Sequence, residues 1–215
     1  MTELFVAAFV TFFVVIDPPG VLPIFAGLTE TASARHRQLM AIKSVFIAAF
    51  VLLGFAYGGE WLLRQLHVSL DAFRIAGGVL LFLIAIDMLF DKRHARREAR
   101  AEAALEHEKA ARPPPAEPDI AVFPMAIPMI AGPGAIASIL LHMNEAASRV
   151  AQLVVLAAVG ANLLFCLLLF LAAGPASRLL GATFTATLTR ILGLVLAALS
   201  VQFILDGVKG SFQLG

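Results

Sequence analysis

Long, continuous runs of apolar residues dominate the chain and predict helices that cross a membrane. A helix that spans the hydrocarbon core of a bilayer needs about 20 mostly apolar residues. The apolar positions here lack the period-two alternation of a membrane β-barrel, so helices are favoured. Six such runs lie at residues 4–28, 40–57, 73–90, 120–143, 150–173 and 188–208. The predicted fold class is therefore an all-α integral membrane protein with six transmembrane helices.

The composition agrees with this class and argues against several others. Apolar residues make up 60% of the 215 residues and charged residues only 14%, whereas soluble domains have about 45–50% and about 25%. So little polar surface cannot cover a globule in water, and a soluble enzyme, a disordered protein or a basic nucleic-acid binder is not expected. The expected partner is the lipid bilayer. With a single cysteine, Cys166, and no metal-ligand spacing, neither a metal site nor a bound cofactor is predicted.

One charged stretch interrupts the apolar pattern and divides the chain. We expect a first three-span repeat at residues 1–90, a charged linker at 91–119 and a second three-span repeat at 120–215. The linker is rich in Ala, Glu and Arg and ends in the proline run 113–115. Our interpretation is a solvated tether that becomes stiff at the prolines. A segment that binds a partner or lipid headgroups is the alternative.

The distribution of Lys and Arg predicts the orientation in the membrane, because cytoplasmic loops are enriched in these residues. With six spans, both termini share one side with loops two and four. That side carries only Arg64, Arg74, Arg149 and Lys209. The other side carries Arg35, Arg37, Lys43, Lys92, Arg93, Arg96, Arg97, Arg100, Lys109, Arg112, Arg178 and Arg190. We therefore expect a multi-pass protein of the cell membrane with outward, periplasmic termini and a cytoplasmic linker.

The two halves resemble each other in sequence. The third span begins RIAGGVLLFL and the sixth begins RILGLVLAAL, so that Arg74 and Gly77 match Arg190 and Gly193. Each half has an odd number of spans, so the second half inserts in the opposite orientation. Inverted repeats of this kind are typical of secondary transporters. Small residues such as AGG in the third span also leave a homo-oligomer open, although packing inside one bundle explains them equally well.

The first and fourth spans both contain helix breakers near the expected middle of the membrane. The breakers are DPPGVLP in the first span and AGPG in the fourth, and each should end one helix and start another near Gly20 and Gly134. A restarted helix offers unbonded N–H groups and a positive dipole end, which suits an anion such as a carboxylate. Ordinary proline kinks are the alternative.

These breaks and nearby polar residues define the candidate substrate-binding site. Asp17 is expected to cap the restarted helix, to bind a substrate ammonium or coupling cation, or to carry a proton. Polar residues within spans have helix–helix packing as the alternative role. Asp87 and His142 are interpreted as residues of interfaces or loops. The candidate residues are Asp17, Pro18, Pro19, Gly20, Pro23, Ala131, Gly132, Pro133, Gly134, Ser138, Asn162 and Gln202.

Four segments resemble the MarC family of six-span inner-membrane proteins, which are also described as small neutral amino-acid exporters close to the LysE type. The segments are DPPGVLPIF, RIAGG, PMAIPMIAGPGAIA and RILGLVLAALSVQFILDG, and only the charged linker falls outside the resemblance. The resemblance implies an inverted-repeat fold with discontinuous first and fourth helices. It also implies small amino-acid substrates such as glycine or alanine, moved with a cation gradient of H⁺ or Na⁺.

The predicted function is a secondary transporter that binds a small neutral amino acid between the two breaks. A membrane scaffold or stress-response factor that acts through the linker is the alternative, and an ion or water channel is a third possibility. An enzyme is not expected, because the sequence contains no nucleophile–base pair, ATP-binding glycine loop or zinc-binding HExxH motif.

Overall fold

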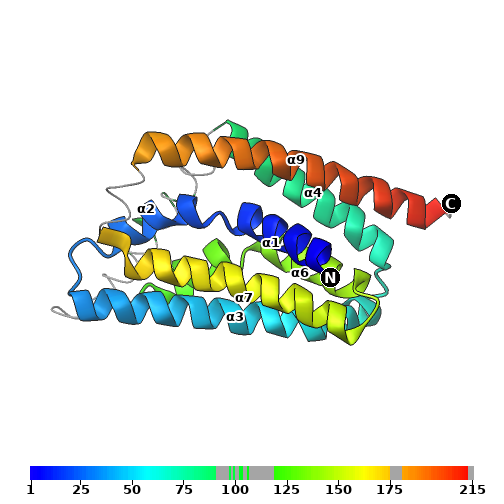
Figure 1. The fold of residues 1–215 in the computed structure, drawn as a ribbon, viewed down its shortest axis with the longest axis horizontal. Helices are drawn as coiled ribbons and strands as arrows, with labels where there is room; N and C mark the ends of the chain where they lie inside the picture. The colour runs from blue at the N-terminus through cyan, green and yellow to red at the C-terminus, as the bar shows by residue number, and fades with distance from the viewer. Residues whose placement is uncertain are drawn as a thin grey trace.

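A computed structural model of the chain describes residues 1–90, 97, 99, 102–103, 106, 119–174 and 181–212. These residues form a bundle of helices that run along a common direction (Figure 1). In chain order the elements are α1 (Thr2–Ile16), α2 (Pro18–Leu28), α3 (Ala34–Gln65), α4 (Leu70–Leu89), η1 (Ala121–Ile130), α6 (Pro133–Glu145), α7 (Arg149–Leu171) and α9 (Ala182–Phe212). Each of the six expected spans falls on one of these helices or on a pair of them.

Five stretches are long and apolar enough to cross a membrane unaided. They are Thr2–Leu28, which includes α1 and α2, together with Ala34–Gln65, Leu70–Leu89, Arg149–Leu171 and Thr183–Phe212. The pair η1 and α6 is the sixth candidate, and its two parts are bent by 55°. The prediction of an all-helical, multi-pass protein is confirmed.

The bent pair runs from one end of the bundle to the other. Asp119, just before η1, lies 3.2 Å from the ammonium group of Lys43 near the start of α3. Glu145, the last residue of α6, lies 3.3 Å from the guanidinium group of Arg74, which follows the end of α3. The pair therefore begins beside the start of α3 and finishes near its end, as a complete crossing does.

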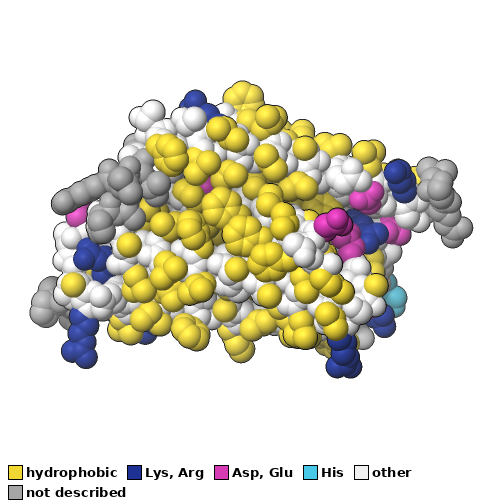
Figure 2. Space-filling model, viewed as in Figure 1, with side chains coloured by type: hydrophobic (Ala, Val, Ile, Leu, Met, Phe, Trp, Pro, Cys, Tyr) yellow, Lys and Arg dark blue, Asp and Glu magenta, His cyan; other side chains and the backbone are white. Residues whose placement is uncertain are grey.

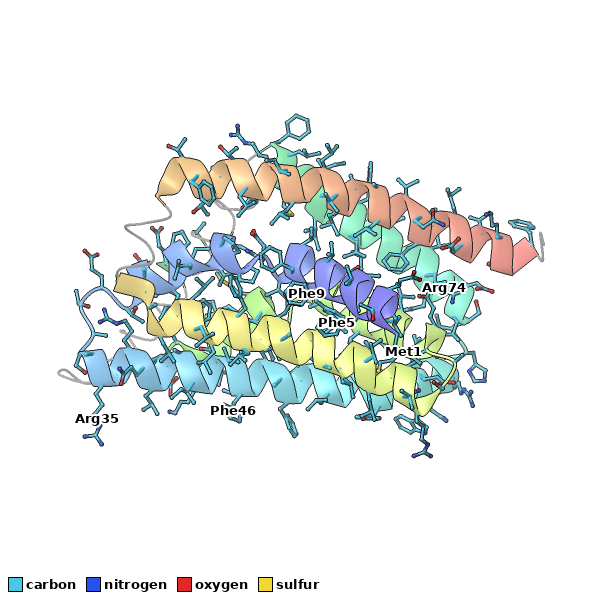
Figure 3. All side chains as sticks on the ribbon, in the orientation of Figure 1. Met1, Phe5, Phe9, Arg35, Phe46 and Arg74 are labelled. Atoms are coloured by element: carbon cyan, nitrogen blue, oxygen red, sulfur yellow. The ribbon has the colours of Figure 1, made fainter. Side chains whose placement is uncertain are left out.

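The two ends of the bundle differ in the segments that they contain. The linker end is where α2 and α4 finish and where α3 and α9 begin, and the terminal end is where α1 begins and α9 finishes (Figure 1). Arg35 marks the linker end, and Met1 and Arg74 mark the terminal end (Figure 3).

The outside of the bundle is apolar between its two ends. Figure 2 shows hydrophobic side chains over the middle of the visible face and charged side chains toward the ends. On α3 the exposed face carries Phe46, Phe50, Tyr57 and Trp61, and Phe46 points away from the bundle (Figure 3). Lipid tails would contact such a surface, and Tyr and Trp are common where a helix leaves the hydrocarbon.

Helices α4 and α9 pack closely through glycines. A Cβ atom on Gly78 would lie 2.8 Å from the backbone oxygen of Ser200, and one on Gly193 would lie 2.8 Å from the Cβ atom of Met88. Small residues let two helix backbones approach in this way. Gly78, from the AGG sequence, is therefore used inside one chain.

Candidate functional site

The first interruption lies at Asp17, between α1 and α2. Asp17 has φ 57° and ψ 62°, a left-handed conformation that ends α1 at Ile16. Aspartate is one of the few residues other than glycine that adopt it readily. The two prolines that follow open α2, at positions where the missing N–H group costs nothing. The second helix therefore begins at Pro18 rather than near Gly20.

The side chain of Asp17 caps the helix that it precedes. Its Oδ1 atom accepts a hydrogen bond from the backbone N–H of Gly20 at 3.2 Å. A Cβ atom at position 20 would overlap this carboxylate, so only glycine fits there. Of the three roles expected for Asp17, the helix cap is therefore observed directly.

The carboxylate of Asp17 is completely buried and has two more partners. Arg97 places a guanidinium nitrogen 3.6 Å from Oδ2, and the Thr189 hydroxyl of α9 donates to Oδ1 at 3.3 Å. Arg97 also donates to the backbone oxygen of Ile16 at 3.4 Å, where α1 ends. A buried charge needs such compensation, because removal from water costs several kcal/mol.

Arg97 comes from the charged stretch at residues 91–119, and for this residue the interpretation of a solvated tether is wrong. Its exposed fraction is only 9%, and its contacts lie inside the bundle. Residues 99, 102, 103 and 106 are exposed, as a tether would be. Apart from these and Asp119, the stretch, including its proline run, lies outside the described residues.

The second interruption has a different local structure. In η1, Phe123 and Ile127 have extended backbone angles, and each precedes a proline. Proline disfavours the helical conformation in the residue before it, which explains both irregularities. Helix α6 then begins at Pro133, with Gly132 at the cap position and no side-chain hydrogen bond. The first N–H groups of α6 therefore have no partner within the helix or from a cap.

The two interruptions lie side by side. A Cβ atom on Gly134 would lie 2.9 Å from Cγ1 of Val15 and 3.0 Å from Cδ1 of Ile84. Val15 is two residues before Asp17, so the end of α1 meets the beginning of α6.

A pocket of about 240 Å³ opens at this junction. Arg97 and Asp87 supply its charged groups, and Gly134 and Ala135 bring the beginning of α6 to its wall. Asp87 is two residues from the end of α4, so the pocket reaches the linker end. The sequence predicts an interfacial Asp87 but does not predict that its side chain lines a pocket. The remaining lining residues are Val15, Leu80, Leu83, Ile84, Pro128, Met129, Ile130, Gly132 and Pro133.

The candidate residues at the breaks occupy three different places. Gly132, Pro133 and Gly134 line the pocket, and Ala131 is buried directly before them. Asp17 is joined to the pocket through Arg97, which contacts both. The other four lie within α2, three buried and the last half-buried, and they are Pro18, Pro19, Gly20 and Pro23.

The polar candidates from other positions are not brought together. Asn162 is buried and donates hydrogen bonds to Phe9 of α1 at 3.1 Å and to Ala158 at 3.0 Å, so it joins α7 to α1. Gln202 is exposed and donates to Asp206 at 2.9 Å. Ser138 is buried on α6, one helical turn beyond the pocket.

Sequence reasoning missed Arg97, Asp87 and Thr189 as residues of the site. Arg97 lies among other basic residues, and nothing in its neighbours' sequence distinguishes it from them. Thr189 carries no signal in a single sequence. The described residues also offer no metal site, because no group of three or more His, Cys, Asp or Glu side chains among them is placed to hold a metal ion.

The helical crossings, the apolar exterior and the buried broken helices define a multi-pass integral membrane protein. The profile of the "MarC family integral membrane protein" matches residues 2–212, and the chain belongs to this family. This is a family of membrane proteins rather than an enzyme family.

Several relatives match nearly the whole chain. A UPF0056 membrane protein of Methanocaldococcus jannaschii is 37% identical over 210 residues, which cover 97% of this chain and 98% of the relative. One from Escherichia coli is 35% identical over 207 residues, 95% of this chain and 91% of the relative. One from Bacillus subtilis is 33% identical over 214 residues, 99% and 97% of the two chains. No solved structure matches the chain.

Proposed function

We propose that the protein is a secondary transporter of small neutral amino acids such as glycine and alanine. The observation that carries this proposal is the pocket at the meeting point of the two interruptions, which combines a cationic side chain, an uncapped helix beginning and an acidic side chain. An amino acid presents a carboxylate and an ammonium group, and such a pocket matches both.

The carboxylate would bind at the beginning of α6. The N–H groups of Gly134 and Ala135 and the positive end of the helix attract an anion, and Arg97 lines the same pocket. Hydrogen bonds between charged groups of this kind are about twice as strong as neutral ones.

The ammonium group would face Asp87, and the segment 128–130, whose residues also line the pocket, would lie beside it. The volume of about 240 Å³ lies below the range of about 300–1,000 Å³ that is usual for drug-sized ligands. The size therefore favours a small substrate.

The proposal includes two inverted repeats, and the contacts between helices support it. An exchange of the first span with the fourth, the second with the fifth and the third with the sixth should preserve the contacts. The contact of α1 with α7, between the first and fifth spans, has its counterpart in the contact of α3 with η1 and α6, between the second and fourth. The contact of α1 with α9, between the first and sixth spans, has its counterpart in that of α4 with α6, between the third and fourth. Helix α4 contacts α9, and α3 contacts α7, as the exchange also requires. Rocking of one repeat against the other would then open the pocket to each side in turn.

We further propose that the linker end is cytoplasmic, that both termini face outward and that the gradient of H⁺ or Na⁺ drives transport. Lys and Arg concentrate at the linker end, as the positive-inside rule requires. The pocket reaches this end, so the present conformation would face the cytoplasm.

The test is counterflow of labelled glycine or alanine in liposomes that contain the purified protein. Arg97→Gln should reduce counterflow at least tenfold, because the carboxylate of the substrate loses the guanidinium group that would bind it. Asp17→Asn should also impair counterflow. The matched control is Arg35→Gln, which removes an exposed arginine at the same end and should leave counterflow unchanged. Wild-type protein without counterflow for any small amino acid contradicts the proposal.

A deletion separates this function from that of a scaffold that acts through the linker. Because Arg97 contacts the broken helix, the deletion must spare it, and residues 99–115 are suitable. A transporter should keep most of its counterflow after this deletion. Loss of a cellular phenotype with counterflow intact would instead favour the scaffold.

A further inference from the structure

Beyond the pocket, the interior face of α6 carries polar side chains toward the terminal end. Gly134 lines the pocket, and Ser138 and His142 follow at intervals of four residues, which places all three on one face of the helix. Ser138 is 0% exposed and His142 is 7% exposed. The interpretation of His142 as a loop residue is therefore wrong, because it lies in a helix with its side chain buried. We infer that the substrate passes along this face of α6, past Ser138 and His142, and that Phe12 and Phe203 close the route in the present conformation.

The hydroxyl group of Ser138 differs from those of other buried serines. Ser44 donates to the backbone oxygen of Met40 at 2.7 Å, and Ser200 donates to that of Ala197 at 2.7 Å. Among the described residues, the Ser138 Oγ atom has no hydrogen-bond partner. A buried hydroxyl without a partner is unfavourable, so its presence points to a ligand that contacts it for part of the time.

His142 lies where aromatic rings close the interior. Its Nδ1 atom is 2.9 Å from the backbone oxygen of Ser138. The centre of its ring is 5.7 Å from that of Phe12 on α1 and 6.0 Å from that of Phe203 on α9. Three helices therefore meet at this level of the bundle.

A second closure lies farther along α6. Arg74 of α4 approaches Glu145 at the end of α6 to 3.3 Å and Asp71 of its own helix to 3.4 Å. Both closures join the first half of the chain to the second, since Phe12 and Arg74 come from the first half and His142 and Glu145 from the second. The relative motion that the proposed function requires would therefore separate both pairs.

The resulting route has polar groups at successive levels, which a zwitterion needs on its way through an apolar bundle. The Ser138 hydroxyl can donate to a carboxylate or accept from an ammonium group. The Nδ1–H group of His142 donates to the backbone oxygen of Ser138, which leaves Nε2 of the neutral imidazole to accept from an ammonium group. This inference rests on the proposed transport function, but it concerns residues outside the pocket.

Cysteine accessibility tests the route, in protein whose native Cys166 is replaced by alanine. Ser138→Cys should react with a small, membrane-impermeant, positively charged thiol reagent when glycine is absent or far below saturation, and saturating glycine should slow the reaction several-fold. The matched control is Ser44→Cys, which changes an equally buried serine whose hydroxyl has a partner. It should remain unreactive.

Removal of a closing ring gives a second, independent measurement. Phe203→Ala should raise passive glycine efflux from liposomes several-fold. The control is Phe170→Ala, because Phe170 is a buried phenylalanine that stacks on Phe25 of α2, with ring centres 4.5 Å apart. It should not raise efflux.

The outcomes separate the two proposals. If the wild-type protein transports glycine while the Ser138→Cys variant is as inert toward the reagent as the Ser44→Cys variant, or if both ring variants leak equally, the route is wrong and the transport function stands. If the wild-type protein transports no amino acid, both proposals fail.

Discussion

The two interrupted helices share a pattern of breakers and use it in opposite ways. At the first interruption Asp17 turns its carboxylate onto the beginning of α2 and is itself held by Arg97 and Thr189. At the second interruption Gly132 has no side chain to offer, and the beginning of α6 meets the pocket. The beginning of α2 is therefore capped by a side chain of the same chain, whereas the beginning of α6 has no side-chain cap and lines the pocket.

We infer that the two interruptions, which lie side by side, have different roles. The first interruption is expected to govern stability, because a buried charge and its partners depend on it. The second is expected to govern which substrates fit. Substitutions at either interruption test this contrast, and the largest effect is expected at the buried carboxylate.

Asp17→Ala should have the largest effect on stability. It removes the cap of α2 and the buried carboxylate that Arg97 contacts, and breaking a buried ion pair typically costs about 3–5 kcal/mol. The measurement is thermal or denaturant unfolding in detergent. For comparison, Lys43→Ala breaks a pair between partly exposed side chains and should cost no more than about 1 kcal/mol. Equal losses in the two variants would contradict the proposed role of Asp17.

Gly20→Ala should destabilise the first interruption by less. The new Cβ atom overlaps the Asp17 carboxylate, and a clash of this kind in a packed interior costs about 1–3 kcal/mol. Gly27→Ala changes a glycine of the same helix where a Cβ atom would meet nothing within 4 Å, so it should be neutral or stabilise by about 0.5–1 kcal/mol. The same unfolding assay measures both, and a stable Gly20→Ala variant would mean that the cap is dispensable.

Gly134→Ala tests the second interruption through substrate selection. Its Cβ atom would approach the side chains of Val15, Ile84 and Leu81 rather than backbone, so the fold should accommodate it while the pocket narrows. One methyl group changes discrimination by about tenfold at the lower end of the usual range. The ratio of alanine to glycine counterflow should fall accordingly, whereas an unchanged ratio would separate this helix beginning from the substrate.

Thr189→Val should have the smallest effect. It removes one hydrogen bond to Asp17, whose carboxylate keeps Gly20 and Arg97, and such a bond contributes about 0.5–1.5 kcal/mol. Thr187→Val removes an exposed hydroxyl on the same helix that bonds to Thr183, and we expect no measurable change in unfolding. A loss as large as that of Asp17→Ala would show that the hydroxyl does more than hold the carboxylate.

Much of the fold was predictable because its signals are local. Apolar runs determine the spans, and proline and glycine mark the interruptions within a few residues of their observed positions. The expected restart at Gly20 was two residues late, since a proline is tolerated at the beginning of a helix and the left-handed residue is the aspartate before it.

The rest of the site depends on contacts between distant segments. Arg97 reaches Asp17 across 80 positions of sequence, and no periodicity in a charged stretch predicts that one arginine is buried. Gln202 illustrates the reverse case. Its polarity within a span favoured a role in the interior, but the face of α9 on which it lies points outward.

The close approach of α4 and α9 has a mechanical consequence. Gly78, Gly193 and Gly207 bring backbone or Cβ atoms of the opposite helix to within 3 Å of where a side chain would begin. With so little between them, these two helices are not expected to slide lengthwise past each other without a collision, so their contact is suited to be a pivot between the two halves of the chain. A change of shape about such a pivot is expected to fall on the helices that are already divided, at Asp17 and at Gly132, next to the pocket that lies between them.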